Sequence, residues 1–148
     1  MKVSVQEIEQ EQSERVVIQC HSVSDKVNSI INFIKSTDTS LFGYEDGRMV
    51  ELFVTDIYYV EAVDNQVFAY TEKDTYQLQI KLYEFEEASK FMRFFRCSKS
   101  MVVNLMKVDS VYPIFNGRFS AKLFNGEEII ISRHYVSALK RMLGGVEQ

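Results

Sequence analysis

The chain has 148 residues, a formal net charge of −4 and a hydrophobic content of 46%, which are typical of a folded domain with one core and exclude a disordered chain. No apolar run is long enough to span a membrane, and charges throughout the first twenty residues exclude a signal peptide. The two cysteines, Cys20 and Cys97, have neither a metal-site nor a disulfide-framework spacing. We therefore expect a cytoplasmic protein with reduced thiols and no membrane insertion.

The first forty residues predict two short strands and a helix. Residues 2–9 and 15–20 have strand-like apolar patterns, and apolar residues then recur at helical spacing after Ser24, a suitable N-cap. This segment is too short to bury much core alone. We interpret residues 1–40 as a strand and helix extension that packs on a main domain of residues 41–148.

The middle of the chain predicts antiparallel hairpins followed by a short helix. Asp46-Gly47 marks a tight turn between apolar runs, because glycine takes the positive φ that such turns need. A second turn is expected near Asp64-Asn65. The strand-like stretches after the first hairpin are 57–63, 67–71 and 75–80. The short helix has an apolar face formed by Leu82, Phe85 and Ala88.

The C-terminal part predicts a three-stranded antiparallel meander and a last helix. Its apolar runs are separated by Asn116-Gly117 and Asn125-Gly126, and Asn-Gly between apolar runs is the strongest short hairpin signal. Pro113 lacks an N–H group and therefore favours an edge strand or a bulge. Ser132 can cap the last helix, which is expected to end at Gly144-Gly145. The inward-facing residues of this helix are expected to be Val136, Leu139 and Leu143.

These elements together predict a mainly β fold (β-rich α+β) of antiparallel sheets with three short helices. The sequence has no phosphate-binding glycine loop, no zinc-protease motif and no serine-nucleophile motif, and its histidines, His21 and His134, have no metal-site spacing. Arg96 and Lys99 would lower the pKa of the Cys97 thiol if it were exposed, but a core-facing cysteine is the commoner case. We expect no enzyme activity and no cofactor or metal.

The charges are distributed unevenly along the chain. Residues 1–90 contain 8 Lys and Arg against 17 Asp and Glu, whereas residues 91–148 contain 9 against 4. Because the local field governs the approach of a charged partner, the C-terminal part can meet a polyanion that the N-terminal part would repel. Chance segregation of solvated charges explains the asymmetry equally well when it is taken alone.

The stretch FFRCSKSMVVN, residues 94–104, combines large apolar side chains with cations and hydroxyls. Further cations lie near turns and helix ends rather than in one continuous run. Loop-borne Arg and Lys on a rigid β scaffold can reach phosphates and the base edges of DNA. The serines of such loops, and the free N–H groups after Ser132, can add hydrogen bonds to phosphate.

Three stretches resemble the LytTR family of bacterial DNA-binding domains. They are DIYYVEAVDNQVFAYT, FFRCSKSMVVNLMKV and NGEEIIISRHYVSALKRML, in this order and spacing. The family pattern has an I-x-Y-I-E strand, an R-x-H-[RK]-S-x-x-V-N segment and a late V-S-R before the last helix. The matching residues are Ile57–Glu61, Arg96–Asn104 and Ile131–Arg133, and the resemblance covers roughly residues 41–143.

The resemblance implies an elongated arrangement of small antiparallel sheets, with loops that enter successive major grooves of duplex DNA. The base-reading residues that it implies are Lys99, Arg133, Asn65 and Gln66. The implied phosphate-side residues are Arg96, Ser98, Ser100, Arg118, Ser132 and His134. Asn104 is expected to be structural, with its side chain holding a turn. Ser98 departs from the histidine that the family usually has there.

The family resemblance also sets expectations about partners. Many members carry a phosphorylated receiver domain, but the roughly 40 residues before this domain are too few for one. We therefore expect a regulator without a receiver. Its control is expected to come from a partner protein, from expression level or from the acidic N-terminal segment. Members tend to occupy paired short direct repeats, which predicts double-stranded DNA as the partner and allows a homodimer. The N-terminal segment could supply the dimer surface, and core packing within one chain is an equally good alternative.

Two other functions are compatible with the residues. A protein-interaction module would recruit another chain to an exposed strand edge and would show little salt dependence. A single-stranded RNA binder would stack bases on exposed aromatic rings, with Tyr112, Phe115 and Phe119 as the candidates. The family resemblance ranks duplex DNA binding above both.

Overall fold

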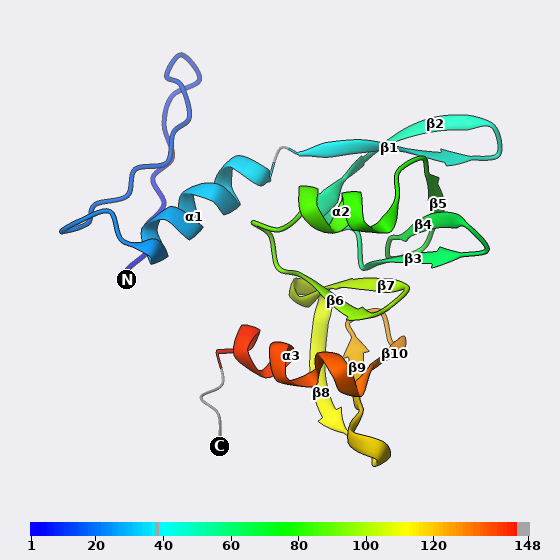
Figure 1. The fold of residues 1–148 in the computed structure, drawn as a ribbon. Coiled ribbons are helices and arrows are strands. Elements are labelled where there is room, and N and C mark those ends of the chain that lie inside the picture. Colours follow the sequence, from blue (N-terminus) through cyan, green and yellow to red (C-terminus); the bar gives the residue numbers. More distant parts are fainter. Residues whose placement is uncertain (38, 145–148) are drawn as a thin grey trace.

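The structure, a computed structural model, describes residues 1–37 and 39–144, and within them it contains two antiparallel sheets and three α-helices (Figure 1). The larger sheet has the strand order β2-β1-β5-β4-β3-β7-β6, and the smaller one has the order β10-β9-β8. The predicted fold class is confirmed. The strands of the larger sheet are β1 (Ser40–Glu45), β2 (Arg48–Phe53), β3 (Tyr59–Val63), β4 (Gln66–Tyr70), β5 (Thr75–Leu78), β6 (Phe94–Ser98) and β7 (Met101–Asn104).

The remaining elements complete this arrangement. The smaller sheet consists of β8 (Val108–Pro113), β9 (Phe119–Leu123) and β10 (Glu128–Ile131). The helices are α1 (Asp25–Ser36), α2 (Leu82–Ala88) and α3 (Val136–Met142), with short 3₁₀ turns η1 (Val54–Asp56), η2 (Leu105–Lys107), η3 (Phe115–Gly117) and η4 (Arg133–Tyr135). None of the helices among the described residues has both the length and the apolar character needed to cross a membrane.

Turn residues with positive φ form the hairpins where the sequence predicts them. Asp46 and Gly47 have φ of 50° and 78°, and Asn116 and Gly117 have φ of 64° and 72°. Asp46 and Gly47 close a two-residue hairpin, because their φ values match the right-handed twist of the flanking strands. Asn116 and Gly117 lie in the longer loop between Pro113 and Phe119. Pro113 lies in β8, an edge strand with a bulge, as predicted.

The molecule has two hydrophobic cores that meet at the strands β6 and β7. The first lies between the larger sheet and α2, and the second lies between β6, β7, the smaller sheet and α3. Cys97 belongs to the second core and has no exposed surface, so burial raises the pKa of its thiol to about 12. The core-facing interpretation of Cys97 is therefore confirmed, and its thiolate is not available for redox chemistry at neutral pH.

Two stacked tyrosines join the larger sheet to the smaller one. The rings of Tyr59 and Tyr70 lie 4.3 Å apart between centroids, and the Tyr59 hydroxyl donates to Glu127 Oε2 at 2.8 Å across the sheets. Tyr70 donates to Glu61 at 3.2 Å. Burial and the two carboxylates raise the pKa of Tyr59 above its usual value. This contact holds the β9–β10 hairpin against β3.

Four local predictions about strands and about burial in helices are wrong. Residues 2–9 and 15–20 form no strands, because no other strand of the described chain pairs with them. Ala88 is exposed; α2 is short, and Ser89 instead takes the buried position, where its hydroxyl donates to the Phe85 carbonyl at 2.8 Å. Leu143 is exposed, since α3 ends one residue before it.

The helix caps agree with the sequence in one case and differ in the other. Ser24 caps α1, with its hydroxyl accepting from the Val27 N–H at 3.3 Å, as predicted. The Ser132 side chain makes no capping hydrogen bond, because a 3₁₀ turn precedes α3 and the Ser132 carbonyl is the group that accepts from Tyr135. Gly144 has φ of 71° after α3, whereas Gly145 lies outside the described residues.

Candidate nucleic-acid interface

The β6–β7 turn presents Lys99 and Ser100 to solvent. Arg96 fixes this turn, because its Nε donates to the Ser98 carbonyl at 2.8 Å and its Nη2 donates to the Lys99 carbonyl. The same guanidinium donates through Nη1 to Glu86 of α2 at 2.8 Å, and the Ser98 hydroxyl accepts from the Ser100 N–H at 3.2 Å. Lys99 therefore extends from a backbone that its neighbours hold in place.

The β3–β4 turn lies beside the β6–β7 turn. The two strands β3 and β7 are antiparallel neighbours, and the Ala62 N–H donates to the Ser100 carbonyl at 2.8 Å. Asp64 and Asn65 form the tip with φ of 51° and 63°, and Asn65 and Gln66 are exposed. Both turns lie on the right-hand side of the view in Figure 1.

A third loop begins where β10 ends. The Ser132 N–H donates to the Cys97 carbonyl at 2.9 Å, which places the start of η4 directly against β6. Arg133 and His134 follow and are exposed, and the His134 ring meets Tyr135 edge-on with centroids 5.1 Å apart. The cations of this loop and of the β6–β7 turn thus project from neighbouring points of the fold.

The η3 loop of the smaller sheet adjoins Arg133. A Cβ at Gly117 would lie 2.9 Å from Arg133 Cδ, so the stem of Arg133 passes directly over the Gly117 backbone. The next residue, Arg118, has its guanidinium carbon 5.1 Å from the centroid of the Phe115 ring. Arg118 Nε is buried without a hydrogen-bond partner in the described chain. The stem of Arg133 therefore lies over the residue that precedes Arg118 in the loop.

These contacts create one continuous row of loops across both sheets. We call it the loop row and define it as residues 63–66, 98–101, 115–118 and 132–134. The structure brings all ten predicted site residues to this row or, for Arg96, to its immediate support. Among the described residues, neither Lys99 nor Arg133 forms an ion pair with a carboxylate. The row can therefore offer free positive charge to an anion.

Glu86 and Gly117 support the loop row through contacts that the sequence does not signal. Glu86 lies in α2 and Arg96 lies in β6, and the end of the helix and a loop separate them. No periodicity of the sequence therefore relates Glu86 to the β6–β7 turn that it helps to fix. Gly117 is predicted as a hairpin residue, but its contact with Arg133 depends on how η4 crosses the smaller sheet. Only the folded arrangement identifies both.

The aromatic candidates for base stacking do not form one surface. Tyr112 pairs with Ser120 on β9, so Tyr112 and the adjacent Phe119 lie on opposite faces of the smaller sheet. Phe115 is 74% exposed and has the Arg118 guanidinium over one side of its ring, and the Lys140 ammonium lies 5.6 Å from the Phe119 ring centroid. The structure therefore gives single-stranded RNA no shared stacking platform.

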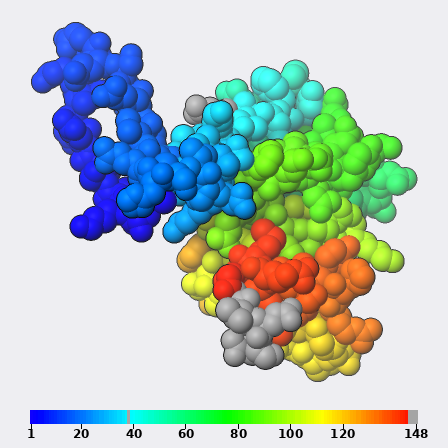
Figure 2. Space-filling model, turned by 60° about the vertical axis from the view of Figure 1, so that its left-hand side comes forward, coloured from blue at the N-terminus to red at the C-terminus, as the bar shows by residue number. Residues whose placement is uncertain are grey.

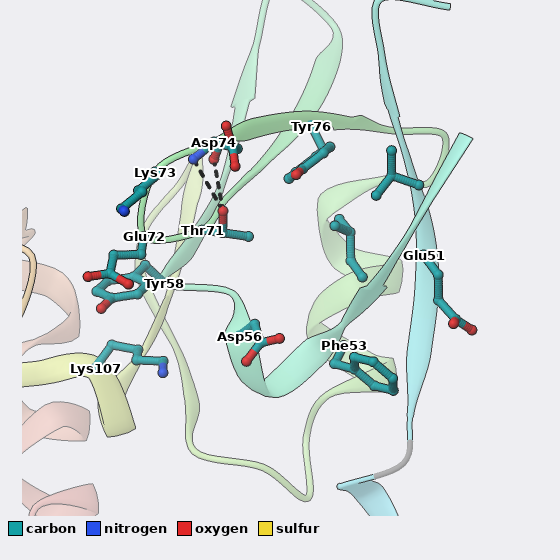
Figure 3. Close-up of a pocket in the computed structure, with 12 residues that line it drawn as sticks. Glu51, Phe53, Asp56, Tyr58, Thr71, Glu72, Lys73, Asp74, Tyr76 and Lys107 are labelled. Atoms are coloured by element: carbon teal, nitrogen blue, oxygen red, sulfur yellow. Dashed lines mark hydrogen bonds between the residues drawn. The ribbon is translucent and has the colours of Figure 1, made fainter. Parts of the chain in front are cut away.

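A depression of about 460 Å³ lies between β2, η1 and the β4–β5 turn, at the opposite end of β4 from the loop row (Figure 3). Four carboxylates and two lysines line it, together with apolar and aromatic residues. Thr71 and Asp74 hydrogen-bond each other at its rim. No set of three or more His, Cys, Asp and Glu residues within the described chain is arranged to hold a metal ion. The acidic lining disfavours phosphate binding here.

Comparison with known proteins gives consistent matches. Residues 47–144 match the LytTr DNA-binding domain family. The Escherichia coli transcriptional regulatory protein YpdB is 30% identical over 117 residues, covering 78% of this chain and 44% of YpdB, so this chain matches less than half of that relative. An uncharacterized HTH-type transcriptional regulator of Staphylococcus aureus is 30% identical over 128 residues, covering 85% of this chain and 86% of the relative.

A solved structure gives the same answer for the fold. The LytTr DNA-binding domain of a Bacillus cereus protein has a TM-score of 0.68 to this chain and 25% sequence identity, covering 72% of this chain and 98% of that domain. The family match, the relatives and this structure confirm the resemblance inferred from the three motifs. The chain belongs to the LytTR family of DNA-binding transcriptional regulators, which are not enzymes.

Proposed function

We propose that this chain regulates transcription in the cytoplasm by binding a specific duplex DNA sequence through the loop row. The observation that carries the proposal is the pair of backbone hydrogen bonds Ala62–Ser100 and Ser132–Cys97, at 2.8 and 2.9 Å, which join three cation- or amide-bearing loops side by side. A rigid row of this kind can enter neighbouring grooves, because its spacing does not depend on a flexible tail.

Within this row, the exposed side chains at the loop tips are assigned to bases. They are Lys99, Arg133, Asn65 and Gln66. Arginine and lysine donate to guanine O6 and N7, and amides pair with adenine. Phosphate contacts fall to the residues that flank the tips, which are Ser100, Arg118, Ser132 and His134. The buried and unpartnered Arg118 Nε supports an anion beside this side chain.

Arg96 and Ser98 have a different part in the proposal. The sequence predicts phosphate contacts for both, but the Nε, Nη1 and Nη2 atoms of Arg96 all donate within the chain, and the Ser98 hydroxyl accepts from Ser100. We assign them to positioning Lys99, with Ser98 retaining a free face toward phosphate. A regulator of this family is further expected to occupy paired short direct repeats, with two copies of the chain on one site.

The proposal is tested by selecting binding sites from a random duplex DNA library with the full chain and then titrating the best site with salt. We expect enrichment of a short repeated motif, and an affinity that falls steeply as salt rises because phosphate contacts release counterions. A well-folded protein that enriches no sequence would overturn the assignment of specific DNA binding. Binding with no salt dependence would instead favour a protein partner.

Gly117→Ala is expected to weaken binding to the selected site, because the added Cβ would displace the stem of Arg133, whose Cδ lies 2.9 Å away. The left-handed φ of 72° should also reduce the free energy of unfolding by roughly 1 kcal/mol. Affinity for the site and Tm are the two measurements.

Gly126→Ala is the matched control for this change. Gly126 also has a left-handed φ, of 93°, in the second Asn-Gly turn of the same sheet, but its Cβ would meet nothing within 4 Å. Both variants should lose similar stability, and only the Gly117 variant should lose DNA affinity. Equal affinities of the two variants would mean that the position of Arg133 does not matter for binding.

A further inference from the structure

Residues 1–24, which we call the N-terminal arm, lie outside both cores. Every residue of the arm is exposed except the half-buried Ile18, and Val3 and Val5 are 89% and 91% exposed. Figure 2 shows the arm standing clear of the rest of the molecule. Its apolar residues nevertheless follow the strand-like patterns that predict strands at 2–9 and 15–20. The arm therefore resembles a strand that lacks a partner.

The charge of the arm indicates what kind of partner fits it. The arm carries four carboxylates, at positions 7, 9, 11 and 14, against the two cations Lys2 and Arg15. DNA phosphates would repel this net negative charge. The arm is therefore unsuited to bind along the DNA backbone beside the loop row. Its exposed valines and its unpaired backbone suit a protein surface with a free strand edge and apolar side chains.

The strand β2 offers such an edge. It is the terminal strand of the larger sheet, and no strand of the described chain pairs with its outer side. The Val54 N–H donates to the Thr39 carbonyl, so the alternation of an antiparallel ladder directs the backbone groups of Met49, Glu51 and Phe53 outward. These groups are free to pair with an added strand.

One face of this hairpin carries three large apolar side chains around Glu51. Phe42 lies opposite Glu51, so both share one face of the sheet with Met49 and Phe53. The exposed fractions of Phe42, Met49 and Phe53 are 52%, 60% and 45%. An added strand would find backbone partners along the edge and apolar contacts on this face.

The other sheet edges carry protection that β2 lacks. The edge of β6 is met by the Ser132 N–H and by the smaller sheet, and β8 contains Pro113 and a bulge. Proteins manage exposed edges by such devices, because a bare apolar edge recruits further strands. The strand β2 has neither a proline nor a bulge in its pairing with β1. We therefore expect another strand to cover the outer edge of β2.

The arm does not cover β2 of its own chain. Helix α1 separates the arm from β1, and its 12 residues extend for about 18 Å. Figure 1 shows the arm at one end of α1 and the β1–β2 hairpin beyond the other end. The β2 edge of one copy is therefore open to the arm of a second copy.

We propose that the N-terminal arm of one copy adds as a strand to the β2 edge of a second copy. The apolar side chains of the arm then cover the face formed by Phe42, Met49 and Phe53. Each copy carries both an arm and an edge, so copies that face the same way, as on direct repeats, can be joined without a twofold axis. This contact lies away from the loop row and does not depend on DNA binding.

The test compares the full chain with two variants by sedimentation over a wide range of concentrations. The arm variant is Val3→Lys with Val5→Lys, and the edge variant is Met49→Lys with Phe53→Lys. The full chain should exceed its monomer mass of 17.3 kDa as concentration rises. Each variant alone should stay monomeric over the same concentrations. The dissociation constant of its self-association should rise at least about tenfold, which corresponds roughly to the loss of one buried apolar side chain.

Mixing the two variants gives the sharpest outcome. The arm variant keeps its edge and the edge variant keeps its arm, so a mixture should form pairs that stop at two chains. Tyr83→Lys, at a side chain of α2 that is 63% exposed, is the control for adding a surface lysine and should associate like the full chain. Circular dichroism checks that each variant is folded.

Three results would overturn the arm–edge contact. They are a full chain that stays monomeric at every concentration, an edge variant that associates like the full chain, and a mixture that forms no pairs. Binding to a single DNA repeat provides a separate readout, because neither variant touches the loop row. Loss of association with retained binding to one repeat supports the contact, whatever the fate of the assigned base contacts.

Discussion

Replacing Lys99 or Arg133 by alanine is expected to weaken binding to the selected duplex about 5- to 150-fold each, which corresponds to roughly 1–3 kcal/mol per lost base contact. Both side chains are exposed at loop tips and form no ion pair among the described residues. Their removal should therefore leave Tm nearly unchanged. Affinity for the selected site, affinity for unrelated duplex DNA, and Tm are the three measurements.

The comparison with unrelated DNA separates the two kinds of contact. Loss of a base contact reduces affinity for the selected site much more than affinity for other sequences, whereas loss of a phosphate contact weakens both alike. Lys99 and Arg133 should behave in the first way. Ser100→Ala and Arg118→Ala should behave in the second way, with Arg118→Ala also reducing the salt dependence.

Lys73→Ala is the matched control for Lys99. Lys73 is an exposed lysine in the β4–β5 turn, at the other end of β4 from the loop row and beside several carboxylates. Its removal changes the net charge by the same amount but should leave specific binding within about twofold, because separated surface charges are largely screened. A similar loss for Lys73 and Lys99 would show that only total charge matters and would contradict the site.

The sequence predicts the turns of this fold well because the chemistry of turns is local. Asn-Gly and Asp-Gly pairs favour positive φ locally, and the hairpins predicted at Gly47 and Gly117 are confirmed. The burial of Cys97 is also predicted, since alternate positions of a strand face the same side. These inferences need only neighbours within a few residues.

The failures have the opposite cause. Strands at residues 2–9 and 15–20 need a partner strand, and local pattern cannot tell whether the chain supplies one. Leu143 is exposed because it is the C-cap residue of α3, beyond the last helical residue. Apolar periodicity therefore overstates burial at the ends of short helices.

The candidate site shows the same division. Lys99, Arg133 and Asn65 are identified by family motifs, and the structure places them in one row. The support of Lys99 by Arg96 and Glu86 is not predictable, because it joins β6 to α2 through side chains. Sequence can thus identify the residues that face outward more readily than the residues that hold them in position.

Asn104→Ala is expected to reduce the free energy of unfolding by roughly 2–4 kcal/mol while leaving the loop row intact. Asn104 is only 2% exposed, and its amide donates to the Ile57 carbonyl at 2.9 Å and accepts from the Met106 N–H at 3.0 Å. This confirms the structural part that the sequence predicts for it. Alanine would leave both partner groups without a bond, and each buried unsatisfied group costs about 1–3 kcal/mol.

Asn125→Ala is the control, because it removes an asparagine that also makes two hydrogen bonds, to Glu127, but at an exposed site where water can replace them. It should lower stability by less than about 1 kcal/mol. Asn104→Asp keeps the acceptor and loses the donor, so its stability should also fall well below that of the native chain. Denaturant unfolding measures all three, and DNA affinity is measured well below each midpoint.

The stability and binding data together decide what Asn104 does. We expect Asn104→Ala to lower the denaturant midpoint and to keep near-native DNA affinity. Asn104 is buried where β7 meets η2 and is not part of the loop row. An unchanged midpoint with lost affinity would place Asn104 at the DNA instead. It would also mean that the turn at residues 104–106 is held by its backbone alone, because the bonds to Ile57 and Met106 would then contribute nothing measurable.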